Sequence, residues 1–189
     1  MKIYMKTNCL QLLVAILLLA GCRHQKTSSN VATVKVDSVA VVDTTVYGVC
    51  GDGCAMHTLQ LLTDGGDTID CMLESSDGSV ETEVKGGMSV GDRVGAVLQR
   101  DADGSVVALS AVNLTSLMGK WGSLELTFRL NPDGTVVGDM KEPHPYTQWK
   151  MCNGKLVLPP DTFDVVALGH DTLSIRNVRE TMHFKRISK

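Results

Sequence analysis

The stretch GKWGSLELTFRLNPDG, residues 119–134, indicates the fold of this chain more directly than any other segment. From Leu124 to Leu130, apolar residues alternate with polar ones, which is the pattern of a β-strand with one buried face. The segment Asn131–Gly134 then predicts a turn, because proline presets φ and glycine tolerates a positive φ. A strand followed at once by a turn is typical of an antiparallel meander. We expect this meander to close, so that no edge is left open.

Strand patterns and turns continue to the C-terminus, so residues 114–189 are predicted to form one β unit. Residues 111–118 predict a single helical turn before it, and further strands are expected at 135–140, 146–151, 156–158, 163–168, 172–178 and 182–186. Trp121 is expected to close one end of the barrel. The other side chains expected inside are large enough to fill it themselves: Leu124, Leu126, Phe128, Leu130, Trp149, Leu173, Ile175 and Phe184.

An earlier β unit is predicted over residues 46–113. Its strand patterns lie at 46–50, 56–62, 68–73, 93–99 and 106–112, with turns at 64–67 and 101–104. Five strands in so short a segment suit a small OB-like or SH3-like barrel. The acidic region 74–87 carries no clear pattern. The predicted fold class is therefore all-β, with two small antiparallel barrel units.

The two units differ in charge, and the chain as a whole is acidic. The 189 residues carry a formal net charge of −3, and residues 46–113 contain 11 acidic and 3 basic side chains. Residues 114–189 contain 8 acidic and 10 basic side chains, so the two units could attract each other. A negative net charge without a basic run argues against nucleic acid as a partner.

The first 22 residues have the pattern of an export signal that ends in a lipidation site. Two lysines and no acid precede a short apolar run, about half the ~20 residues that a membrane-spanning helix needs. The run ends in Leu19-Ala20-Gly21-Cys22, which resembles the lipobox of bacterial lipoproteins. The resemblance implies cleavage before Cys22, a diacylglyceryl group on its thiol and usually an acylated amine. Two or three such chains, palmitate among them, hold a protein durably on a membrane.

A second resemblance concerns the rest of the chain. Gly119-Lys120-Trp121 resembles the G-x-W triplet that opens lipocalin barrels, and Trp149 lies in a later strand pattern. The stretches AMHTLQLLTDGGDT (55–68), GGMSVGDRVGAVL (86–98) and NLTSLMGKW (113–121) are similar to a family of lipocalin-like lipoproteins from Bacteroidetes. The resemblance runs from about Val46 to the C-terminus. It implies an envelope lipoprotein with a small β-barrel and names no substrate.

These patterns together predict the organisation of the chain. A signal peptide occupies residues 1–21 and a lipidated tether residues 22–45. A five-stranded barrel follows at 46–113, and a lipocalin-like barrel at 114–189. Some surface lipoproteins of this kind carry an acidic run after the lipidated cysteine. Cys22 is followed by no such run, which favours the periplasmic side of the outer membrane.

Residues 87–91 spell G-x-S-x-G, the motif that places a nucleophilic serine on a strand-to-helix turn in α/β-hydrolases. Here Gly91 and Asp92 lead directly into a strand pattern, and no α/β pattern surrounds Ser89. We therefore interpret the segment as a loop, and we assign no catalytic residue.

Cys50, Cys54 and His57 carry the soft ligand atoms that suit zinc or copper. A fourth ligand is not apparent, so a loop disulfide is the alternative, and we predict neither a metal nor a cofactor. With Cys71 and Cys152 the mature chain has four non-lipidated cysteines, whose three full pairings the sequence leaves open. Export permits disulfides, while an apolar strand face also suits Cys71 as a free thiol.

The remaining polar motifs are interpreted as surface features. His144, His170 and His183 stand at no spacing that pairs them with a nucleophile. Asp101-x-Asp103-Gly104 begins like a calcium-binding loop, but its twelfth position is a valine, which cannot chelate. The acids between 74 and 83 could bind calcium weakly, although a solvated loop is the simpler interpretation.

Two short motifs lie between the lipidation site and the first unit. Asp37-Ser38-Val39 and Asp43-Thr44-Thr45 resemble the Asp-Ser/Thr-apolar site that Bacteroides-type bacteria O-glycosylate in exported proteins. The resemblance implies Ser38 and Thr44 as sugar acceptors.

The sequence favours a non-catalytic envelope lipoprotein that binds or scaffolds a partner, either a small apolar ligand or an envelope protein. A lipocalin-like carrier is the first alternative, and it would need a cavity lined by apolar residues. An envelope enzyme is the second, and it would need histidine, serine or carboxylate side chains that converge on one point.

Overall fold

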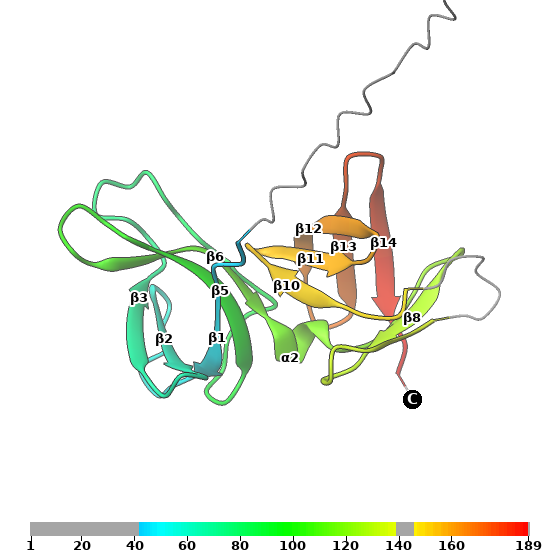
Figure 1. The fold of residues 1–189 in the computed structure, drawn as a ribbon, viewed down its shortest axis with the longest axis horizontal. Coiled ribbons are helices and arrows are strands. Elements are labelled where there is room, and N and C mark those ends of the chain that lie inside the picture. Colours follow the sequence, from blue (N-terminus) through cyan, green and yellow to red (C-terminus); the bar gives the residue numbers. More distant parts are fainter. Residues whose placement is uncertain (1–41, 139–145, 189) are drawn as a thin grey trace, which may run out of the picture. The chain divides into compact units, whose positions relative to one another are not determined.

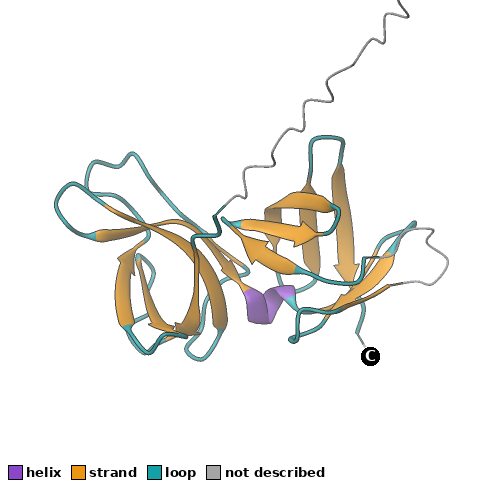
Figure 2. Cartoon of the chain, in the orientation of Figure 1, coloured by secondary structure: helices purple, strands orange, loops and turns teal. Residues whose placement is uncertain are grey.

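The computed structural model describes residues 42–138 and 146–188, and in this part the regular secondary structure is almost entirely β-strand (Figure 2). Two sheets follow one another along the chain, with one short helix between them (Figure 1). Both lie in one compact unit, Val41–Lys189. The predicted all-β fold class is confirmed.

The first sheet is a small ring of strands. Its order is β3-β2-β1-β5-β6-β4, and β3 also pairs with β6 in parallel through Met72 and Val107. Five strands therefore close on themselves, as in an OB-fold, so the structure favours the OB-like alternative. The six strands are β1 (Thr45–Cys50), β2 (Thr58–Thr63), β3 (Thr68–Met72), β4 (Val84–Lys85), β5 (Arg93–Arg100) and β6 (Val106–Asn113).

Alternation along these strands builds the core of the first sheet. In β2, Leu59 and Leu61 are fully buried whereas Leu62 is exposed, which is the period of two that a half-buried strand requires. A shift of register between Val97 and Leu98 lets the long β5–β6 pair bend around this core. The buried residues that pack together are Cys50, Leu59, Leu61, Cys71, Leu73, Val84, Val94, Ala96, Ala108 and Ala111.

The helix α2 (Leu114–Leu117) is a single turn directly after β6, as the sequence predicts. The buried Asn113 caps it, because its side-chain oxygen accepts a hydrogen bond from the Ser116 backbone N–H at 2.9 Å. Leu114 and Leu117 are buried and join the core of the second sheet.

The second sheet is an eight-stranded antiparallel meander that turns back on itself. Its order is β10-β11-β12-β13-β14-β7-β8-β9, so the first strand of the meander pairs with the last. An isolated bridge between Thr135 and Gln148 joins the two ends of this order. The strands are β7 (Gly119–Gly122), β8 (Thr127–Leu130), β9 (Val136–Gly138), β10 (Lys150–Cys152), β11 (Lys155–Leu158), β12 (Asp161–Leu168), β13 (Thr172–Arg176) and β14 (Thr181–Arg186).

Most of the side chains expected inside this sheet are buried, and one prediction is wrong. The buried ones are Phe128, Leu130, Trp149, Leu173, Ile175 and Phe184. Leu126 is half-buried, whereas Leu124 is fully exposed. The cause is a tight turn at 123–126, in which the Ser123 N–H donates to the Leu126 carbonyl at 2.8 Å. The predicted strand therefore begins only at Thr127.

Two other strands are shorter than predicted. The 172–178 pattern ends at Arg176, because Asn177 begins a turn in which its side-chain oxygen accepts from the Arg179 and Glu180 backbones. Strand β10 begins at Lys150 rather than at 146. Strand β9 is described over Val136–Gly138, and residues 139 and 140 of its predicted range lie outside the described residues. The acidic region 74–87 contributes β4.

Candidate functional site

The residues predicted to carry lipid lie outside the described part of the chain. Leu19, Ala20, Gly21 and Cys22 fall there, as does the possible sugar acceptor Ser38. Their assignment stays a prediction. Among the described residues, no helix has the length and apolarity to cross a membrane.

The other possible sugar acceptor, Thr44, is exposed but already hydrogen-bonded. Its backbone N–H and its hydroxyl both donate to the Asn153 side-chain oxygen, at 2.8 Å and 2.7 Å. Asn153 and Gly154 form the β10–β11 turn with φ of 50° and 76°, and the Asn153 N–H donates to the Thr45 hydroxyl at 2.8 Å. A sugar on Thr44 would remove one of these bonds.

Tyr47 makes a second link between β1 and β10. Its hydroxyl donates to the Met151 carbonyl at 2.8 Å, and its half-buried ring packs against the core of the second sheet. Burial raises the pKa of the Tyr47 phenol, so the hydroxyl keeps the proton that it donates. The first strand of one sheet is thereby attached to the second sheet.

The G-x-W triplet is a structural site. Trp121 is fully buried, and its indole N–H donates to the Leu117 carbonyl at 2.8 Å, which fixes the strand to the helical turn before it. The Arg186 guanidinium lies over the Trp121 ring, 4.1 Å from its centre. A Cβ at Gly119, where φ is 126°, would lie 2.5 Å from Arg186 Nη1, so the arginine occupies the space that this glycine leaves.

Arg186 also satisfies three carbonyl groups from two parts of the chain. Nη1 donates to the Met118 carbonyl at 2.9 Å, and Nη2 donates to the Ser116 carbonyl at 2.5 Å. Nε donates to the His170 carbonyl at 2.6 Å. The last strand is thereby joined to α2 and to the β12–β13 turn. The sequence offers no signal for this role, since Arg186 is simply the last residue of a strand pattern.

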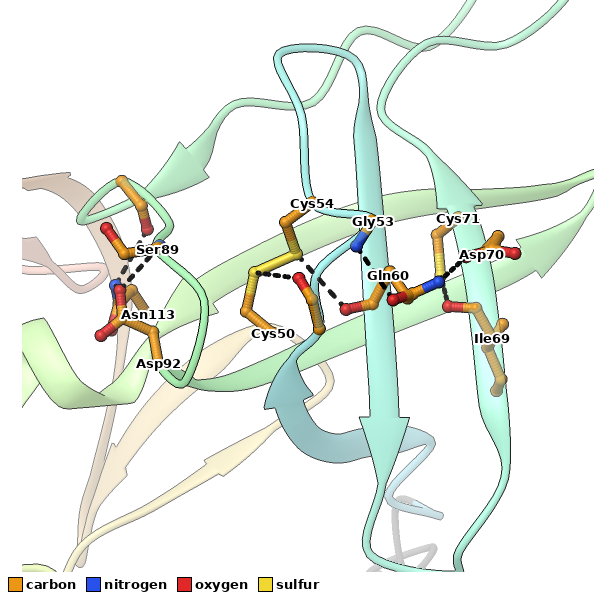
Figure 3. Close-up of a disulfide and its surroundings, with 12 residues drawn as sticks. Cys50, Gly53, Cys54, Gln60, Ile69, Asp70, Cys71, Ser89, Asp92 and Asn113 are labelled. Atoms are coloured by element: carbon orange, nitrogen blue, oxygen red, sulfur yellow. Dashed lines mark hydrogen bonds between the residues drawn. A yellow bond between two sulfur atoms is a disulfide. The ribbon is translucent and has the colours of Figure 1, made fainter.

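The G-x-S-x-G segment is a loop, as predicted. The Ser89 N–H donates to Asp92 Oδ2 at 2.9 Å, and the same oxygen accepts from the buried Asn113 amide at 2.8 Å (Figure 3). The Asn113 amide also donates to the Gly87 carbonyl at 3.0 Å. The Asp92 carboxylate therefore holds the loop through the Ser89 backbone N–H. Among the described residues, no histidine is hydrogen-bonded to Ser89.

Cys50 and Cys54 form a disulfide, which replaces the metal interpretation of these residues (Figure 3). It closes a short loop that Gln60 also holds, because the Gln60 side-chain oxygen accepts from the Gly53 N–H at 3.0 Å. Cys71 is a buried free thiol, and burial raises its pKa to about 11. Cys152 is a half-buried free thiol in β10.

The histidines and the aspartate turn are surface features. His170 lies in a turn beside Asp171, with Nδ1 2.7 Å from the carboxylate, and His144 lies outside the described residues. His183 Nδ1 is 2.8 Å from the Ser174 hydroxyl, a contact that depends on the β13–β14 register and that the sequence did not predict. Asp101–Gly104 is a turn closed by the Gly104 N–H, which donates to the Asp101 carbonyl at 3.0 Å.

Open grooves mark the outer surface of both sheets. One of about 480 Å³ lies beside the end of β3 and is largely acidic, with Glu74, Glu81 and Glu83 among its lining residues. Such a surface repels polyanions. A groove of about 530 Å³ lies between β14 and the 123–126 turn of the second sheet, with the half-buried apolar residues Leu126 and Met182 on its two walls.

The described residues contain no group of three or more side chains placed to hold a metal ion. Comparison of the chain with protein-family models, with curated proteins and with solved structures found no match. The candidate site is therefore the groove-bearing surface of the two sheets, defined by geometry alone.

Proposed function

We propose that the protein is a lipid-anchored, non-catalytic binding or scaffold protein of the bacterial envelope, similar in its sequence motifs to lipocalin-like lipoproteins of Bacteroidetes. The observation that carries this proposal is the lipobox at Leu19–Cys22, after a basic start and a short apolar run. Acylation at Cys22 would place both β sheets beside a membrane, at the end of a tether of about 20 residues.

The disulfide supports export. Disulfides persist in oxidising compartments such as the bacterial periplasm and are rare in the cytosol. The Cys50–Cys54 bridge joins the buried end of β1 to the half-buried Cys54.

The packing supports recognition on the outer surface. The second sheet encloses its own large side chains, with Leu173, Phe128 and Ile175 almost completely buried. The Ser174–His183 pair lies on the exposed face, and within residues 42–138 and 146–188 no third group is hydrogen-bonded to the imidazole. A carrier of a small apolar ligand is the second candidate, favoured by the closed order of the eight strands and disfavoured by the filled interior. An enzyme has the least support.

Metabolic labelling with palmitate tests the anchor. We expect label on the wild-type protein in the membrane fraction, no label on Cys22→Ser, and full label on the matched control Cys152→Ser. Equal labelling of wild type and Cys22→Ser would contradict the proposal.

Two further measurements address location and partner. Protease treatment of intact cells should leave the protein uncut if it faces the periplasm. Native mass spectrometry of protein from its own host should show a bound protein or a sugar at Ser38 or Thr44. A stoichiometric apolar small molecule would favour the carrier instead.

A further inference from the structure

The β13–β14 hairpin is longer than the β7–β8 hairpin beside it. Part of β14 therefore has no neighbouring strand on the side of β7. Strand β14 pairs with β13 from Thr181 to Lys185 and Arg176 to Thr172, but it pairs with β7 only through Lys185 and Arg186. Strand β7 ends at Gly122, where the chain turns back through residues 123–126. Residues 181–184 therefore form a short sheet edge, which borders the 530 Å³ groove.

The hydrogen-bond pattern shows which backbone groups face that edge. The Asn177 N–H donates to the Glu180 carbonyl, and the Arg186 N–H donates to the Asp171 carbonyl. Bonded pairs alternate along an antiparallel ladder, so Met182 and Phe184 bond to β13. Thr181 and His183 then direct their N–H and C=O groups away from β13, towards the groove, and no described backbone group bonds to them there.

The side chains around the edge favour one kind of occupant. The inward positions of the two strands are Leu173, Ile175, Met182 and Phe184, all apolar. The outward positions hold no acid: Thr172, Ser174, Arg176, Thr181, His183 and Lys185. An added strand would continue both faces, with apolar side chains inward against Leu126 and Met182 and acidic ones outward. Glu125 and Glu180 also line the groove, in the turn segments before β8 and before β14, and neither is among these outward strand positions.

We propose that this edge binds an extended segment of a partner protein, with alternating apolar and acidic residues, as an added strand antiparallel to β14. The inference rests on the proposed binding function and names its class of partner. A second copy of the chain is a poorer fit. Two edge residues offer at most four hydrogen bonds, whereas a stable dimer buries about 800 Å² on each partner.

The probe is the peptide Asp-Val-Asp-Val-Asp-Val-amide with fluorescein on its N-terminal amine, titrated with mature lipidated protein in detergent and followed by anisotropy. In antiparallel pairing, residues directly opposite share a face, so the aspartates would lie opposite Thr181 and His183 and bond to them. We expect saturable binding that N-methylation of the aspartates abolishes. N-methylation of the valines, whose N–H groups face away from β14, should leave it unchanged.

Two substitutions of His183 separate the contribution of its backbone N–H to peptide binding from that of its side chain. His183→Pro removes an N–H that faces the groove and no backbone bond to β13, as edge strands tolerate. The side-chain contact with Ser174 is lost in His183→Pro and in His183→Ala alike. It should weaken peptide binding at least about tenfold. His183→Ala keeps the N–H and should bind within about twofold of wild type. Thr181→Pro, at the start of β14, repeats the test should His183→Pro fail to fold.

Hydrogen exchange gives an independent measurement. The Thr181 and His183 amides should exchange quickly in the free protein and become protected when the peptide binds. Absence of saturable binding, or equal binding by His183→Pro and His183→Ala, would overturn the proposal. So would a concentration-dependent dimer that His183→Pro abolishes, because the occupant would then be a second copy. Palmitate labelling of Cys22 tests the lipid anchor separately. A failure of the anchor proposal can therefore be distinguished from a failure of the proposal that β14 binds an added strand.

Discussion

Arg186 joins the last strand of the second sheet to the start of the sheet and to one of its turns. It stacks on Trp121 and donates to carbonyls of α2, of the residue after it and of the β12–β13 turn. The guanidinium matches this task because it offers five donors in a planar fork, which lysine cannot reproduce.

Replacing Arg186 with methionine should therefore destabilise the protein. The side chain keeps apolar contact with Trp121 but leaves three carbonyls without their charged donor, and we expect a loss of about 2–3 kcal/mol in the free energy of unfolding. Urea denaturation followed by tryptophan emission measures it. Arg176→Met, on the exposed face of β13, is the matched control and should change stability by less than about 0.5 kcal/mol. Equal effects of the two substitutions would contradict the assigned role.

The two free thiols in the described part of the chain, Cys71 and Cys152, should differ in reactivity. Burial excludes reagent from Cys71 and raises its pKa to about 11, so its thiolate, the reactive form, is scarce near pH 8. Cys152 is half-buried. Iodoacetamide at about pH 8 should label Cys152 first and Cys71 only in denaturant, as peptide mass spectrometry would show. The fraction of Cys71 thiolate should rise as the pH approaches 11. Labelling of native Cys71 as fast as Cys152 would refute this assignment.

Single-residue roles were predictable where a local motif defines them. The G-x-W resemblance placed Trp121 at the start of the second unit, and its complete burial follows. The Ser174–His183 contact and the three bonds of Arg186 were not predictable, because each depends on which strands become neighbours. The pairing of Cys50 with Cys54 was one of the alternatives that the sequence left open.

At the scale of secondary-structure elements, alternation located the strands well and their ends less well. The patterns at 93–99 and 106–112 match β5 (Arg93–Arg100) and β6 (Val106–Asn113), because Asp101–Gly104 is a strong turn between them. The prediction for Leu124 was wrong because the alternation of apolar and polar residues continues by chance through the 123–126 turn. Strand β4 was missed because its two residues are defined by pairing with Ala111 and Val112, far along the chain.

The junction between β6 and α2 depends on Asn113, which is buried with all its polar atoms used. Its amide donates to Gly87 and Asp92, and its oxygen caps the helix. Asn113→Ala should lower the free energy of unfolding by about 1–3 kcal/mol, because the helix cap and two buried hydrogen bonds are lost together. It should also speed backbone hydrogen exchange in the 87–92 loop. The exposed turn residue Pro132→Ala is a suitable control. Unchanged stability in Asn113→Ala would show that water replaces these bonds.

At the scale of the whole molecule, the sequence indicated two β units but not how each ring closes. The first closes through one parallel pair, Met72 with Val107, and the second through Thr135 with Gln148. Both contacts join residues that local patterns do not relate. Burial of the expected side chains in the second unit was predictable because large apolar residues recur at inward positions.

A barrel that is filled by its own side chains should not carry lipids, and this separates a scaffold from a carrier. An eight-stranded barrel is just wide enough for its side chains or for one small ligand. Here Trp121, Phe128 and Leu173 are at most 1% exposed. Titration with fatty acids, following emission from Trp121 and Trp149, should therefore show no saturable change. Leu173→Ala titrated with benzene provides the positive control, because an apolar cavity opened in a rigid core binds ligands of that size. Stoichiometric binding of a fatty acid to the wild type at micromolar or tighter affinity would refute the packed interior and make the carrier the better proposal.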